Sequence, residues 1–296
     1  MRHVLTIKDL GEETCWLLVQ QAMGIPDAKS STDFMAERVA LLVFAQSSLA
    51  ERMCVTAAVR QMSGSTIYQG TDGSWRREVM EYQEHLMPIF GYYVDCLYTY
   101  GLPVSKWEMN REEIRFPVIN AGSPDAHPAH VLADIACMLR ASRTLEGVTA
   151  AWIGCNNGTL HSLIEAMAWF PFSLRVALPP HLEVSGFKEA VQRMGHAVSF
   201  VETPEEAIRD ANFVFAGCRG EMDTAQAGAW KLDRRLMGLA RPNAGLLLSA
   251  SPIEAIPLER ELLASPTSLL TRQAENRLRV HKRILHWVFQ ENEQDI

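Results

Sequence analysis

Apolar runs that fit buried strands alternate with runs of helical periodicity along most of the chain. Strand-like runs occur at residues 38–45, 65–70, 94–101, 116–122, 149–155, 174–179, 197–201, 212–217 and 244–250. Helix-like runs occur at residues 48–62, 77–93, 127–142, 161–170, 185–195, 204–211 and 273–290. This alternation with short connections predicts parallel sheets that are covered by helices on both faces.

The alternation forms two series, which the long helix near residues 128–142 joins. We therefore predict an α/β protein with two doubly wound parallel-sheet domains, residues 1–132 and 133–270. The C-terminal helix, residues 271–296, is expected to pack back on the first domain, because its apolar stripe must be buried. In open sheets of this type ligands bind at the carboxyl ends of the strands, which places the loops after residues 45, 122, 153, 216 and 250 in one candidate cleft.

Composition and charge exclude some classes of function. The 296 residues are 48 % hydrophobic and 21 % charged, with a formal net charge of −7, which disfavours binding to nucleic acid. The most basic run, residues 277–283, is expected to be a solvated helix face. No apolar run reaches the ~20 residues of a membrane span, and the N-terminal ten residues do not fit a signal peptide.

Cysteine and aromatic usage indicate compartment and packing. The six cysteines are dispersed and contain no CxxC pair, so we expect a reduced, cytoplasmic protein in which each cysteine is a small buried residue. A dense group of aromatic residues is expected in the core or in a subunit interface. This group comprises Trp75, Tyr82, Tyr92 and Tyr93.

Three stretches resemble, in order, segments of the aspartate/ornithine carbamoyltransferase family. Residues 116–134 are similar to its strand–loop–helix segment with the motif His-Pro-x-Gln, and residues 145–163 to the start of its second domain. Residues 265–282 are similar to the Ala-Glu-Asn-Arg helix of the ornithine branch. The resemblance implies a carbamoyl-phosphate domain, an amino-acid domain, interdomain helices and a homotrimer. It also implies a reaction in which an amine attacks the carbonyl of carbamoyl phosphate and phosphate departs, catalysed mainly by positioning and charge stabilisation.

The resemblance places the family's phosphate loop, Ser-Thr-Arg-Thr-Arg, on residues 48–52. The residues at these positions are Ser48, Leu49, Ala50, Glu51 and Arg52. Only Ser48 and Arg52 match the family's phosphate loop. Glu51 carries a negative charge where a phosphate dianion is expected, unless its side chain points away. The two charge-assisted contacts that are missing would together be worth about 3–6 kcal/mol.

Other positions of the first domain follow from the same resemblance. Tyr100 stands where the family has an arginine, and His130 where it has a glutamine. His127 matches the histidine that binds the carbonyl oxygen, and Arg277 matches an arginine that reaches the same oxygen. Carbonyl-side residues are therefore retained, while phosphate-side residues are lost.

The second domain is altered as well. In the ornithine-branch motif Asp-x-x-x-Ser-Met-Gly, the resemblance assigns Gly217 to the aspartate and Glu221 to the serine, and keeps Met222. Ser249 begins the segment that replaces His-Cys-Leu-Pro, and Asn157 lies near an Asn-Asn pair of the family.

Several of these residues have a structural alternative. Ser47 and Ser48 can cap the following helix, with or without binding an anion. Arg52 can pair with Glu51 or with Glu81, and His127 can bond the backbone at the start of its helix.

The sequence indicates no metal or cofactor. His127 and His130, at i and i+3, can bind a metal, but no third ligand is apparent. Residues 154–158 follow a strand but lack the GxGxxG pattern of a dinucleotide loop.

Two functional hypotheses follow. In the first, the protein is a divergent enzyme of the family that transfers a carbamoyl or related acyl group to or from a small amine or amino acid. Ordinary ornithine carbamoyltransferase activity is then absent or weak, and the catalytic residues are His127, Arg277 and Arg52. The substrate-binding residues are Ser47, Ser48, Tyr100, His130, Asn157, Glu221, Met222 and Ser249. In the second, it is a non-catalytic ligand-binding homologue or an inactive partner subunit. Neither hypothesis involves nucleic acid or a membrane.

Overall fold

The computed structural model describes residues 1–25, 27–70, 83–108, 111–112, 114–180, 185–195, 197–218, 230–249 and 257–290. The chain forms two compact units. The first comprises Met1–Ala133 and Ala274–Ile296, and the second comprises Asp134–Gln273. In the part of the chain that the structure describes, no helix is both long and apolar enough to span a bilayer.

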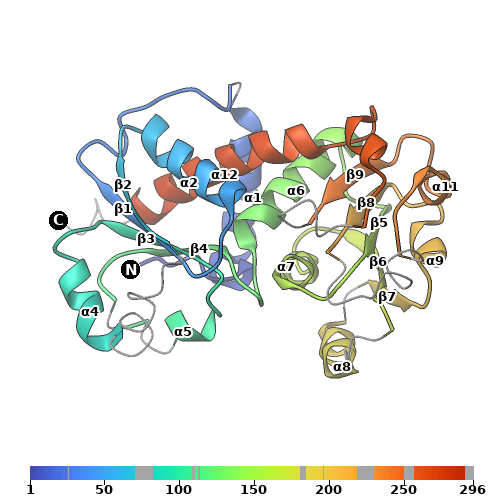
Figure 1. Cartoon of the computed structure of the whole chain (residues 1–296), viewed down its shortest axis with the longest axis horizontal. Helices are drawn as coiled ribbons and strands as arrows, with labels where there is room; N and C mark the ends of the chain where they lie inside the picture. Colours follow the sequence, from blue (N-terminus) through green and yellow to red (C-terminus); the bar gives the residue numbers. More distant parts are fainter. Residues whose placement is uncertain are drawn as a thin grey trace. The chain divides into compact units, whose positions relative to one another are not determined.

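The first unit is built on a four-stranded parallel sheet with the order β2-β1-β3-β4. The strands are β1 (Val39–Phe44), β2 (Ser65–Gln69), β3 (Cys96–Tyr100) and β4 (Val118–Gly122). Leu41 and Val43 share a buried cluster with Met87 of α4 (Gln83–Phe90) and Trp107 of α5 (Ser105–Glu108). Figure 1 shows α2 (Leu49–Gln61) and α12 (Leu270–Gln290) over the opposite face.

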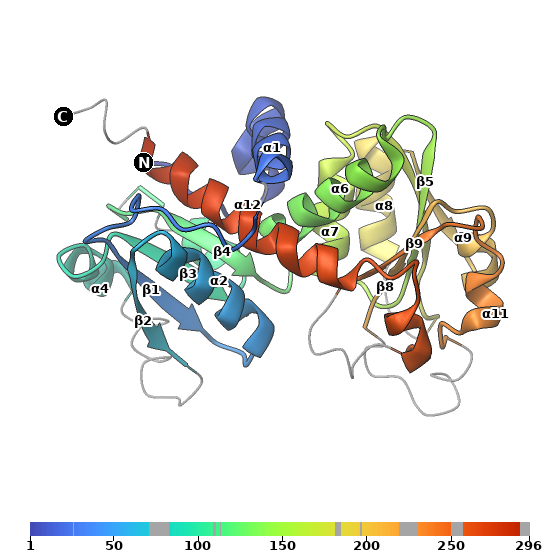
Figure 2. The same ribbon diagram turned by 90° about the horizontal axis from the view of Figure 1, so that it is seen from above.

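The second unit contains a five-stranded parallel sheet with the order β7-β6-β5-β8-β9. The strands are β5 (Val148–Ile153), β6 (Phe172–Ala177), β7 (Val198–Val201), β8 (Phe213–Ala216) and β9 (Gly245–Leu248). The helices α9 (Pro204–Ile208) and α11 (Arg234–Met237) lie on one face, and α7 (Gly158–Ala166) and α8 (Ser185–Met194) on the other (Figure 2). The 3-10 helix η2 spans Arg260–Ala264.

The predicted fold class is confirmed, since both sheets are parallel and each is covered on both faces. The strand order reverses between β1 and β3 in one sheet and between β5 and β8 in the other, and ligands bind at such points in open α/β sheets.

Some helices differ from those predicted. The helix α1 (Ile7–Gly24) was not predicted, and of the helix expected at 77–93 only α4 falls within the described residues. The helix α6 (Pro128–Ser142) agrees closely with its prediction. The helix α7 begins at Gly158, earlier than expected, because the side chain of Asn157 caps it by accepting hydrogen bonds from two backbone N–H groups of its first turn.

The basic run at residues 277–283 is not a solvated face, and that prediction was wrong. Arg279, His281 and Lys282 keep only 5 %, 1 % and 5 % of their surface exposed. Lys282 Nζ donates hydrogen bonds to the carbonyl oxygens of Ala28 and Ser30, at 2.8 and 2.6 Å. This part of α12 belongs to the first unit, which covers basic side chains as well as the apolar stripe.

The aromatic group is only partly described. Tyr92 and Tyr93 are 89 % and 69 % exposed, so they do not belong to the core of this chain. Their place in a subunit interface stays a prediction, and Trp75 and Tyr82 lie outside the described residues.

Candidate functional site

The first turn of α2 places an acidic side chain inside the first unit. Ser48 is the N-cap residue, and its Oγ accepts a 3.3 Å hydrogen bond from the backbone N–H of Glu51. Leu49 and Ala50 are exposed, whereas Glu51 is 1 % exposed. The first turn of the helix therefore places a carboxylate on its buried side.

Arg277 from α12 binds this carboxylate. Its Nη1 donates a 2.6 Å hydrogen bond to Glu51 Oε1, and the two side chains are 12 % and 2 % exposed. Glu51 Oε2 is buried and has no hydrogen-bond partner among the described residues. Burial alone would raise the pKa of Glu51, but the attraction of Arg277, His127 and His281 outweighs it, and the pKa is lowered. Glu51 is therefore ionised at neutral pH, and its charge cancels that of Arg277.

Three histidines lie around this ion pair. His127 Nε2 is 4.0 Å from Glu51 Oε1, and the ring centroids of His127 and His130 are 4.7 Å apart. His281, one helical turn after Arg277, is buried and interacts electrostatically with Glu51 and His127. We call these five residues the Glu51 cluster.

Two of the three histidines, His127 and His281, add little charge to the Glu51 cluster. Burial lowers the pKa of His127, with Glu51 partly opposing the change. Burial also lowers the pKa of His281 to about 4. Both imidazole rings are therefore neutral at pH 7. With the Glu51 and Arg277 charges balanced as well, these four side chains carry a net charge close to zero.

Tyr100 and Gly122 complete the surroundings of His127. Tyr100, at the end of β3, shares a side-chain hydrogen bond with Ser48, and burial raises its pKa, so that its hydroxyl keeps its proton. Its ring centroid is 6.5 Å from that of His127. Gly122 has φ +142°, and a Cβ there would lie 2.8 Å from the Tyr100 ring and 2.9 Å from His127 Nε2. Only glycine allows both rings to approach the end of β4 so closely.

Two predicted site residues at the start of α2, Arg52 of the phosphate loop and Ser47 just before it, do not join the Glu51 cluster. Arg52 is exposed, and its guanidinium lies over the ring of Tyr68, 4.7 Å from the centroid. Ser47 is also exposed. Successive residues of a helical turn point in different directions, so Glu51 faces the interior and Arg52 does not.

The second unit holds the other predicted residues. Asn157 Oδ1 accepts hydrogen bonds from the backbone N–H groups of Thr159 and Leu160, at 3.0 and 3.1 Å. The carbonyl oxygen of buried Ser249 accepts a 2.9 Å hydrogen bond from Thr159 Oγ1. Asn157 and Ser249 thus both contact the first turn of α7. Glu221 and Met222 lie outside the described residues.

Two cysteines of the second unit form a disulfide. Cys155 follows β5 and Cys218 follows β8, so both lie where the strand order of this sheet reverses, with Cα atoms 5.7 Å apart. The expectation that all six cysteines are separate, reduced residues is therefore wrong for this pair. The spacing of 63 residues hid it, because pairing depends on which strands become neighbours. With one disulfide present, cysteine usage no longer points to a reduced compartment, and the cytoplasmic location stays a prediction.

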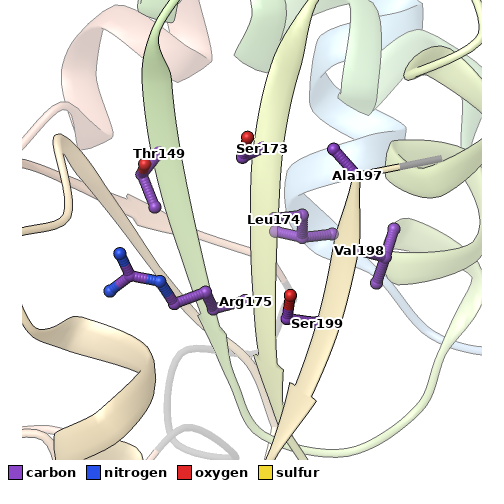
Figure 3. Close-up of a pocket in the computed structure, with 7 residues that line it drawn as sticks. All are labelled: Thr149, Ser173, Leu174, Arg175, Ala197, Val198 and Ser199. Carbon is purple, nitrogen blue, oxygen red and sulfur yellow. The ribbon is translucent and has the colours of Figure 1, made fainter.

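A pocket of about 310 Å³ lies elsewhere on the second sheet. Figure 3 shows its lining on the adjacent strands β5, β6 and β7, with Thr149, Ser173 and Val198 at or next to the strands' first residues. The pocket therefore lies toward the amino ends of the strands, away from the edge where open parallel sheets bind ligands.

Comparison with family models covers almost the whole chain. Residues 2–140 match the model described as aspartate/ornithine carbamoyltransferase, carbamoyl-P binding domain. Residues 146–288 match the model described as aspartate/ornithine carbamoyltransferase, Asp/Orn binding domain. The chain belongs to the aspartate/ornithine carbamoyltransferase family.

Individual relatives of this carbamoyltransferase-family protein agree. The chain is 29 % identical over 304 residues to the ornithine carbamoyltransferase of Nitratidesulfovibrio vulgaris, covering 98 % of this chain and 99 % of that one. It is 27 % identical over 309 residues to the enzyme of Bacillus subtilis, covering 99 % and 95 %. The crystal structure of ornithine carbamoyltransferase from Thermus thermophilus has the same fold, with a TM-score of 0.86, 23 % identity and coverage of 97 % and 99 %.

Within this family member, the structure brings Ser48, Tyr100, His127, His130 and Arg277 into one region, and their role in a site stays a prediction. It adds His281, which the sequence reasoning missed. The sequence spacing could have indicated His281, because residues 277 and 281 are four apart on one helix and therefore lie on the same face.

Proposed function

We propose that the protein is a divergent carbamoyltransferase-family enzyme that transfers a carbamoyl or related acyl group to or from a small amine or amino acid. Ordinary ornithine carbamoyltransferase activity is proposed to be absent or weak. The observation that supports the proposed divergence is the buried ion pair between Glu51 and Arg277. The transferase class rests on the family to which the chain belongs.

The ion pair disfavours a dianionic phosphate at the start of α2. The resemblance places the phosphate loop on residues 48–52, and Glu51 of that loop is an ionised, buried carboxylate. Two unit charges of like sign 4 Å apart repel by about 4 kcal/mol at an effective dielectric constant of 20. Arg277 offers little relief, because its charge is already balanced by Glu51.

A neutral carbonyl group finds better partners in the same region. Tyr100 keeps its phenolic proton, and Arg277 is a second hydrogen-bond donor in this region. Such donors stabilise negative charge that develops on a carbonyl oxygen during acyl transfer. We therefore assign catalysis to His127 and Arg277 and substrate binding to Ser48, Tyr100 and His130. Arg52, which faces Tyr68, no longer has a proposed role in catalysis.

The second unit is proposed to bind the acceptor. Asn157 and Ser249 are the described candidates, and Glu221 and Met222 remain predictions. A homotrimer is proposed from the family resemblance alone, and it would have about three times the 33.2 kDa mass of one chain. The non-catalytic alternative is not favoured by the named relatives, which are ornithine carbamoyltransferases.

A citrulline assay tests the altered activity. Purified protein with millimolar carbamoyl phosphate and ornithine is expected to form citrulline at a rate far below that of the Bacillus subtilis enzyme, assayed in parallel. Robust citrulline formation by this protein would refute the proposal.

A thermal-shift screen then asks what binds. Carbamoyl phosphate and phosphate are expected to leave the melting temperature unchanged, whereas citrulline or an amino acid raises it, because a ligand that binds only the folded state stabilises by mass action. Stabilisation by carbamoyl phosphate at micromolar concentration would contradict the electrostatic argument.

A further inference from the structure

We infer that Glu51, His127 and His130 form a binding site for a divalent metal ion of the zinc type. Each side chain offers one ligand atom, and the three atoms lie within 4.8 Å of one another. The first turn of α2 supplies the carboxylate, while the histidines come from the residue before α6 and from its first turn. The sequence indicated no metal because the third ligand lies on another helix.

The chemistry of the three ligands defines the class of metal. Two imidazoles and one carboxylate are a ligand set that binds catalytic zinc, with a fourth position left for water or substrate. The same ligands also accept Co²⁺, Ni²⁺ and Cu²⁺, whereas Mg²⁺ and Ca²⁺ prefer oxygen alone. Tetrahedral zinc at 2.0–2.2 Å holds its ligand atoms roughly 3.4 Å apart, so on binding the widest pair here closes by at most roughly 1.4 Å. Rotation about the side-chain bonds of Glu51 can supply that movement.

Neighbouring groups already orient two of the ligands. Arg277 holds Oε1 of Glu51, which leaves the buried Oε2 with no hydrogen-bond partner among the described residues. His127 makes a hydrogen bond with the backbone of Ala121, and the absence of a Cβ at Gly122 lets its ring approach. Metal-binding histidines and carboxylates are commonly held in this way by backbone and charged partners.

The ligands are shielded from solvent. Glu51 and His130 are 1 % and 4 % exposed, and the side chain of His127 is 12 % exposed. The thiol of Cys54, one turn after Glu51, does not compete, because burial and then the Glu51 charge raise its pKa to about 12. Arg277 repels a dication, so we expect weaker metal binding than at a site with no neighbouring cation.

Cobalt titration tests the site without any measurement of turnover. Protein freed of metal by a chelator is titrated with Co²⁺, and visible ligand-field bands report its coordination. We expect saturation at one Co²⁺ per chain, displacement by Zn²⁺ and a rise in melting temperature with either metal. His130→Asn and Glu51→Gln should each weaken binding by about 10- to 100-fold. Exposed His85→Asn serves as the matched control and should leave binding unchanged.

Three results would overturn the inference. These are no Co²⁺ binding at millimolar concentration, binding that His130→Asn leaves unchanged, and sulfur-to-cobalt charge-transfer bands that reveal cysteine ligation instead. Circular dichroism of each variant checks that it is folded. If Glu51→Gln does not fold, His130→Asn decides, because it replaces one ring without disturbing the ion pair. Citrulline formation and the thermal-shift screen are measured on protein freed of metal, so failure of the metal site and failure of the proposed function are distinguishable.

Discussion

Removing one partner of the Glu51–Arg277 ion pair leaves a charge buried with nothing to balance it. Nη1 and Oε1 are 2.6 Å apart, and the side chains are 12 % and 2 % exposed, so solvent cannot replace the lost partner. Breaking such a pair from one side costs about 3–5 kcal/mol. We therefore expect Glu51→Leu and Arg277→Met each to lower the melting temperature of the first unit by roughly 10 °C, as a loss of this size does in a domain of about 150 residues.

The loss of stability in the Glu51→Leu/Arg277→Met double variant should be smaller than the sum of the losses in the two single variants. Replacing both charges with apolar side chains of similar size removes the desolvation penalty together with the attraction, so Glu51→Leu/Arg277→Met should recover most of the lost stability. Urea denaturation followed by circular dichroism of the four proteins then gives a coupling free energy of about 3 kcal/mol or more.

An exposed ion pair in the second unit is the matched control. Arg235 Nη2 and Glu205 Oε1 are 3.0 Å apart, but their side chains are 69 % and 38 % exposed. The same double-mutant cycle there should give about 0.2–1 kcal/mol. Additive single changes at Glu51 and Arg277, with a coupling no larger than that of the control, would refute the view that these charges are buried and balance each other.

Two further predictions concern acid and reductant. Burial lowers the pKa of His3 to about 4, with smaller contributions from Arg111 and the N-terminal amine and an opposing one from Asp9. As the pH falls, His3 takes up a proton in the unfolded chain first, because a histidine pKa there is near 6.5. The free energy of unfolding is therefore retained above pH ~6.5 and falls by up to about 3 kcal/mol toward pH ~4. The free energy of unfolding of His3→Gln should fall less than that of the unchanged protein over this pH range. If the two proteins lose stability in parallel as the pH falls, His3 is not the group responsible. The Cys155–Cys218 disulfide predicts that denatured, unreduced protein shows four titratable thiols and reduced protein six, and six in both would disprove the bond. Reduction should also destabilise the second unit by up to about 4 kcal/mol, as loop-closure entropy predicts for this spacing.

The near-neutral Glu51 cluster bears on how the family fold can be reused. Family membership rests on matches over residues 2–140 and 146–288, and the parallel sheets with their strand reversals are retained. The difference that we propose is the charge at one helix start. Because catalysis resides in a few side chains placed on a common fold, a single buried carboxylate can alter the ligand without altering the architecture.

The periodicity of the sequence was enough to predict most strands and helices and therefore the fold class. Runs such as residues 39–44 and 118–122 are short, apolar and β-branched, and the helices between them repeat at helical spacing. These patterns are local, so they predict strands and helices without knowledge of the rest of the chain. Ser48 at the start of α2 and Asn157 at the start of α7 are local signals of the same kind, since an N-cap acts within three residues.

What the tertiary structure decided is which of these elements meet. Whether Glu51 points inward depends on the face that α2 packs against the sheet, and its partner Arg277 comes from the far end of the chain. The pairing of Cys155 with Cys218 follows from β5 lying next to β8, and the burial of Arg279 and Lys282 follows from the position of α12 inside the first unit. Sequence patterns report the environment of each segment, whereas charge pairing, disulfides and ligand sets depend on contacts between segments that only the folded chain brings together.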